Sequence, residues 1–129
     1  PVRTLRALSQ YRKLFFHDTL NSQSSLVSNR QHIDAALEWL CFAQDISGDG
    51  GVCAGFNLIK NKWSFSYPET TGYIITTFFD YYRMFGNQEI RNRAIKMAQW
   101  EVSIQLDCGG FQSGIITPDR QFLKSKNSA

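Results

Sequence analysis

Apolar residues recur with the period of an α-helix along much of the chain. In residues 2–16 they fall on one broad face, and in residues 30–44 they follow the spacing of an amphipathic helix. Residues 73–85 are apolar nearly all round, which is typical of a helix enclosed by protein, and another helix is expected over residues 89–105. The pattern therefore predicts an all-α fold. The apolar residues of the first two helices are Val2, Leu5, Leu8 and Phe15, then Ile33, Ala36, Leu37, Leu40 and Cys41.

Polar and glycine-rich segments separate these helices. Residues 17–29 are rich in Ser and Asn and predict a linker, at whose end Ser28 or Asn29 caps the next helix. That helix should end at about Gln44, because the glycines that follow are costly inside a helix. A long connection over residues 45–66 leads to the third helix.

The third helix carries start and stop signals in its sequence. Ser66 and Glu69 have the spacing of a capping box, and Pro68 is tolerated in a first turn. The β-branched and aromatic residues of 73–79 also favour a strand, but we reject this alternative because the apolar run is long, capped and stopped by Gly86. The short connection there predicts an antiparallel helical hairpin.

A Trp–Gln pair followed by Gly-Gly occurs twice, with an offset of 61 residues. Each copy predicts a helix that ends in Gln, a tight turn, a long connection and a second helix, a unit that must stack on neighbours to bury its faces. We interpret the Gln as a donor to the carbonyls of its own last helical turn, and the Trp as filler of the seam between hairpins. The copies are Trp39, Gln44, Gly50 and Gly51, then Trp100, Gln105, Gly109 and Gly110.

The second copy resembles a motif of known helical toroids. Residues 105–111 (QLDCGGF) have the spacing of the Q-x-x-D-G-G-W motif of terpene cyclases and prenyltransferase-type α/α toroids, with Cys108 in place of Asp and Phe111 in place of Trp. In those proteins the motif braces neighbouring helices and is not catalytic. The resemblance thus implies a structural role for the repeat.

A closer likeness covers residues 30–115, where AALEWLCFAQDISGDGGV, SYPETTGYIITTFFDYYRMFG and MAQWEVSIQLDCGGF resemble a family of bacterial α/α-toroid proteins. That family has prenyltransferase-type repeats, is six-hairpin-glycosidase-like and is associated with surface polysaccharide metabolism. Its toroid is larger than this chain, so we expect residues 1–129 to be a fragment that forms one partial toroid domain. Within it we expect two hairpin units in residues 30–115 and an irregular tail at 116–129.

The resemblance places an active site where long loops meet the N-termini of inner helices. Glu69, at the start of the helix 67–85, is the leading catalytic candidate, with Asp49 as the second carboxyl group of a sugar-processing pair. The competing interpretations are helix capping for Glu69 and turn formation for Asp49. The helix start favours an anion or a polyhydroxyl ligand. Candidate substrate-binding residues are Tyr67, Thr70, Thr71, Tyr73, Trp63, Asp45 and Asp107.

Composition and charge argue against two classes of binding partner, nucleic acids and membranes. The net charge is +3, and residues 1–14 carry Arg3, Arg6, Arg12 and Lys13 without an acid. No clear basic face appears, so no nucleic-acid partner is expected. The apolar-rich stretch 72–85 is too short and too charged to cross a bilayer, so no membrane partner is expected.

The cysteines and acidic residues predict neither a disulfide framework nor a metal centre. Three cysteines without a C-x-x-C pattern favour reduced thiols and a cytoplasmic location. The run from Asp45 to Gly50 begins like a calcium loop, but Phe56 stands where that loop needs Glu. We expect no metal and no cofactor.

Three functions remain open. The first is a carbohydrate-active domain that binds or processes a polysaccharide, and any enzyme activity would be glycosidase-, lyase- or epimerase-like. The second is a non-catalytic helical module that binds a protein partner or itself through exposed hairpin faces. The third, a terpenoid or prenyl-transfer toroid, ranks lowest, because no D-x-D-D or D-D-x-x-D cluster is present.

Overall fold

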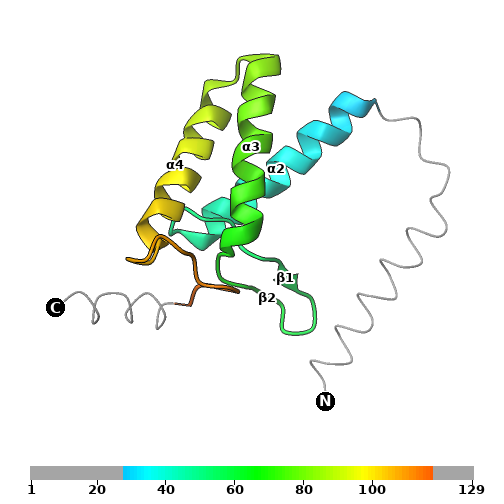
Figure 1. The fold of residues 1–129 in the computed structure, drawn as a ribbon. Coiled ribbons are helices and arrows are strands. Elements are labelled where there is room, and N and C mark those ends of the chain that lie inside the picture. The colour runs from blue at the N-terminus through cyan, green and yellow to red at the C-terminus, as the bar shows by residue number, and fades with distance from the viewer. Residues whose placement is uncertain (1–27, 118–129) are drawn as a thin grey trace.

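The described part of the chain is mostly helical, as the sequence predicted. A computed structural model describes residues 28–117, so the predicted helix 2–16, most of the linker and the end of the tail lie outside the described residues. Within residues 28–117 three helices carry the fold, and a small antiparallel hairpin lies in the long connection (Figure 1). The elements are α2 (Asn29–Ser47), β1 (Phe56–Asn57), β2 (Lys62–Trp63), α3 (Pro68–Phe85) and α4 (Gln88–Ile104).

Helices α3 and α4 form the predicted hairpin and lie side by side (Figure 1). Gly86 ends α3 with φ 70°, a left-handed conformation that glycine adopts without a steric penalty. Asn87 then caps α4, because its side-chain oxygen accepts hydrogen bonds from the amides of Glu89 and Ile90. The helix over 73–79 confirms that the strand alternative was rightly rejected.

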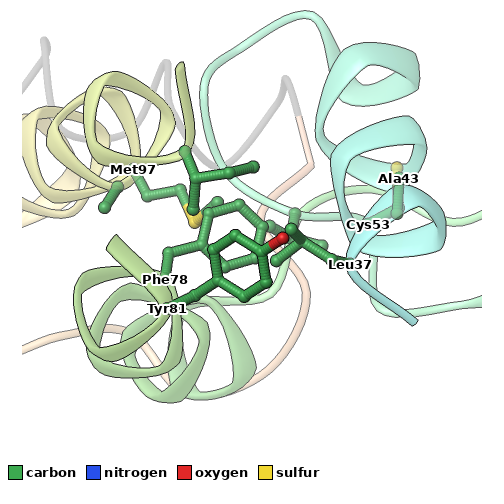
Figure 2. Packing of buried hydrophobic residues seen from close by; sticks show 9 residues of the cluster. Leu37, Ala43, Cys53, Phe78, Tyr81 and Met97 are labelled. Atoms are coloured by element: carbon green, nitrogen blue, oxygen red, sulfur yellow. The ribbon is translucent and has the colours of Figure 1, made fainter. Parts of the chain in front are cut away.

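Helix α2 packs obliquely against this hairpin. Ser28 caps it in a full capping box with Gln31, and it runs past the predicted end at Gln44 to Ser47. In Figure 2, Leu37 of α2 meets Phe78 and Tyr81 of α3 beside Met97 of α4. Phe78 and Met97 are completely buried, so this contact forms the centre of the core.

Gln44 connects α2 to the glycine turn and to α4. Its side chain is 1% exposed, and its Nε2 donates to the carbonyls of Gly50 (3.1 Å) and Arg93 (3.2 Å). We had expected Gln44 to donate to carbonyls of its own last helical turn, and this expectation is wrong, because its donor group is engaged with the glycine turn and with α4. The repeat therefore does brace neighbouring helices, at least in its first copy.

The two tryptophans of the repeat have different environments. Trp100 is 4% exposed and lies against Gly51, so it fills the seam between α4 and the glycine turn. Trp39 is 55% exposed, and its predicted seam position is wrong. The prediction that protein encloses α3 is also wrong for the described residues, because Tyr73 and Met84 are 70% and 64% exposed.

The contact between Gly51 and Trp100 gives a test of this packing. A Cβ at position 51 would lie 2.8 Å from three ring atoms of Trp100, so Gly51→Ala should destabilise the fold by about 1–3 kcal/mol through overpacking. Gly55→Ala is the matched control, because nothing lies within 4 Å of its added Cβ. Urea unfolding measures both changes. Equal midpoints for the two variants would show that the ring moves aside without cost.

Candidate functional site

A pocket of about 700 Å³ lies where the N-terminus of α3 meets the end of α4. The antiparallel hairpin brings these two helix ends together, and the loop after α4 forms the remaining wall. This is the end of α3 where the sequence placed the active site. The lining residues come from α3 and its N-cap (Tyr67, Pro68, Glu69, Gly72, Tyr73 and Thr76), from α4 (Glu101) and from the loop (Phe111, Gln112, Ser113 and Gly114).

Hydrogen bonds from distant segments fix the start of α3. Asp49 accepts from the Ser66 hydroxyl (2.8 Å) and from the Gly51 amide (2.9 Å). Thr71 accepts from the Val52 amide (3.0 Å), and its hydroxyl donates to the Tyr67 carbonyl (2.8 Å). These contacts give Asp49 and Thr71 structural roles beside the pocket, and neither residue lines it.

Glu69 faces the pocket instead of capping the helix. The predicted capping box is wrong, because Tyr67 is the N-cap residue and Ser66 is engaged with Asp49. The Tyr67 hydroxyl donates to Glu69 Oε2 (2.7 Å), and this hydrogen bond raises the pKa of the phenol above its ordinary value. The bond fixes the position of the carboxylate at the pocket wall.

Glu101 is a functional candidate that the sequence analysis missed. It lies in the last turn of α4, and its Oε1 is buried without a hydrogen-bond partner among the described residues. Burial removes water from the charged form and raises the pKa of Glu101 from 4.5 to about 7. Two carboxyl groups in different environments therefore share one pocket. The only signal in the sequence was indirect, since a hairpin places the end of α4 beside the start of α3.

The other predicted residues lie outside the pocket. Trp63 packs in an aromatic cluster with Trp39, 5.1 Å between ring centroids. Asp45 forms an ion pair with Arg93 (2.8 Å), and this hydrogen bond lowers the pKa of Asp45. Thr70 donates to the Tyr67 carbonyl, and Asp107 is exposed in the turn after α4. Of the predicted site residues, Glu69, Tyr67 and Tyr73 therefore line the pocket, and the remaining candidates lie outside it.

The lining has an acidic and aromatic character. Glu69 and Glu101 contribute two carboxyl groups, and no Lys, Arg or His is among the described residues that line the pocket. The rings of Tyr67, Tyr73 and Phe111 supply flat apolar surface. Such a lining suits an uncharged polyhydroxyl ligand and disfavours an anion. Of the two ligand types expected from the helix start, the pocket therefore favours the polyhydroxyl ligand.

Two further features bear on the chemistry of residues 28–117. This part of the chain contains no group of three or more His, Cys, Asp or Glu side chains placed to hold a metal ion. None of its helices is both long and apolar enough to cross a membrane.

Comparison with known proteins gives no match, whether the chain is compared with family models, with curated proteins or with solved structures. The functional argument therefore depends on the geometry of the pocket.

The raised pKa of Glu101 predicts a pH-dependent stability. Between pH 4.5 and about 7 the folded state holds a proton that the unfolded chain has released, so stability falls as pH rises through this window. Glu101→Gln removes the titrating group and should gain stability relative to the native chain as pH increases. Thermal unfolding from pH 4 to pH 8 measures this difference. Asp107→Asn, at an exposed position in the turn after α4, is the control and should follow the native profile. Parallel profiles for Glu101→Gln and the native chain would contradict the burial of a protonated carboxyl group.

Proposed function

We propose that the chain is part of an α/α toroid whose pocket beside α3 binds, and in the complete protein hydrolyses, a polysaccharide built from uncharged sugars. The observation that carries the proposal is the meeting of Glu69 and Glu101 in one aromatic-lined pocket. Aromatic faces and carboxylate acceptors are the groups that bind sugar rings and hydroxyls. A cytoplasmic location remains part of this proposal.

The shape of the pocket supports sugar binding. Its volume of about 700 Å³ is within the usual range for small-molecule sites, so it would accommodate one or a few sugar units. Tyr73 and Phe111 are 70% and 50% exposed, and their rings are therefore available for contact with a ligand. A lone exposed aromatic residue is ordinary, but here two of them border the same pocket as both carboxyl groups.

The two carboxyl groups suit the division of roles in glycoside hydrolysis. Glu101, with a pKa of about 7, would protonate the glycosidic oxygen as the bond from the anomeric carbon to that oxygen breaks. Glu69, held by Tyr67, would act on the opposite side, either by taking a proton from the attacking water or by bonding to the anomeric carbon before water releases it. Lyase and epimerase reactions commonly act on uronic acids, for which this lining has no cationic partner. Hydrolysis is therefore the reaction class we favour.

The packing also supports membership of a toroid. The α3–α4 hairpin, the Gln44 contact to α4 and the Trp100–Gly51 contact make one hairpin stack on the preceding helix. Stacking of this kind is how helical repeats bury their faces. The prenyl-transfer alternative gains no support, because the lining offers no cationic group for a diphosphate.

Binding can be tested with soluble polysaccharides in affinity electrophoresis. We expect the native chain to be retarded by a neutral glucan, galactan or mannan and not by an anionic uronan. Tyr73→Ala should abolish the retardation, whereas Met84→Ala, at an exposed position near the other end of α3, should preserve it. Equal retardation of both variants, or retardation by the uronan alone, would contradict the proposed ligand class.

Turnover tests the catalytic part of the proposal. Release of reducing ends from a bound polysaccharide should fall by about 10²–10⁴-fold in Glu101→Gln, the range typical of a lost general acid. Glu69→Gln should also abolish turnover while leaving the fold intact, and Glu38→Gln should have no effect. In the active protein the rate should fall as pH rises through about 7, because Glu101 then loses its proton. An unchanged rate in Glu69→Gln would show that Glu69 has a structural role and no catalytic one.

A further inference from the structure

Helix α2 carries a second apolar stripe that the described residues cover only in part. Ala35, Trp39, Phe42 and Ile46 stand at i, i+4, i+7 and i+11, so they lie along one face of the helix. This face differs from the one that sends Leu37 into the core. Trp39, Phe42 and Ile46 are 55%, 49% and 45% exposed. We call these four residues the outer stripe.

One edge of the outer stripe is already fixed. The rings of Trp39 and Phe42 pack on Trp63 of β2, with centroid separations of 5.1 and 5.7 Å. These contacts hold both rings in place and leave about half of each uncovered. Apolar surface in a continuous patch of this kind usually marks an interaction site. Its spacing, repeated over three turns, matches the seam that one helix presents to another.

We propose that residues 2–16 of the same chain form a helix that packs on the outer stripe. The apolar positions of that segment fall on one broad face, as a partner of the stripe requires. Residues 17–27 link it to Ser28 and can span about 36–40 Å when extended, which exceeds the length of about 28 Å for the 19 residues of α2. The linker therefore allows the segment to fold back antiparallel along α2.

Charge favours this occupant over a second copy of the chain. Helix α2 carries Asp34, Glu38 and Asp45 against Arg30 alone, while residues 1–14 have four basic side chains and no acid. Asp34 and Asp45 already pair with arginines, but Glu38 has no ion pair within residues 28–117. A second α2 would bring the same negative charge to the stripe, whereas the basic segment complements it.

The test uses the full chain and the fluorescence of Trp39, obtained as the difference between the native chain and Trp39→Phe. We expect acrylamide to quench Trp39 weakly in the native chain and severalfold more strongly in Leu8→Asp, which places a charge on the apolar face of the segment. Gln10→Asp adds the same charge at a polar position and should behave as the native chain. Glu38→Lys should also increase quenching, most strongly at low salt, and it changes an exposed side chain outside the core.

Sedimentation at two protein concentrations identifies the occupant. A monomer with protected Trp39 at both concentrations supports the proposal. Protection that appears only with dimer formation would assign the stripe to a second copy and overturn it. Unchanged quenching in both Leu8→Asp and Glu38→Lys would equally overturn it, whether the native Trp39 is protected or not. Circular dichroism confirms that each variant retains the helices, so loss of protection is not confused with unfolding.

Discussion

The buried amide of Gln44 is the interaction on which the rest of the described structure depends. Its donor group joins two carbonyls, from the glycine turn and from α4, and its oxygen accepts from the Arg93 guanidinium at 3.2 Å. A buried amide left without partners costs about 1–3 kcal/mol, so α2, the turn and α4 are held in one relative position. With the turn in place, Asp49 accepts a hydrogen bond from the Ser66 hydroxyl, and this bond fixes the position of the start of α3. The pocket forms at that start, so its geometry depends on a residue that does not touch it.

The same hairpin geometry explains why the two carboxyl groups of the pocket lie in different environments. Glu69 lies at the N-terminus of α3, where the helix dipole favours negative charge, and it has the Tyr67 hydroxyl as a donor. Glu101 lies near the C-terminus of α4, and burial raises its pKa to about 7. Antiparallel packing of two helices thus brings an exposed carboxyl group and a partly buried one into the same pocket. The proposed acid and the proposed base of the hydrolysis therefore come from different helices of one hairpin.

The sequence predicted the features that depend on neighbouring residues. Ser28 and Gly86 act within one helical turn, so their roles at the helix ends could be inferred from spacing. Features that depend on distant partners could not be inferred. Ser66 has the local spacing of a cap, yet it donates to Asp49, 17 residues away. The protonation of Glu101 follows from burial that only the packed hairpin creates. The repeat assigned equal roles to Trp39 and Trp100, but α4 packs on the first glycine turn and leaves Trp39 exposed.

The two copies of the repeat also show what a neighbouring helix contributes. Gln44 is buried because α4 lies beside it and supplies the Arg93 carbonyl and guanidinium. Gln105 occupies the equivalent position, but residues 28–117 give its side chain a single hydrogen bond, to the Gly109 carbonyl at 2.7 Å. It is correspondingly only half-buried. The motif alone therefore forms the local glycine turn, and the bracing function requires a helix packed next to it. The outer stripe of α2 is a second surface that the described residues leave partly uncovered.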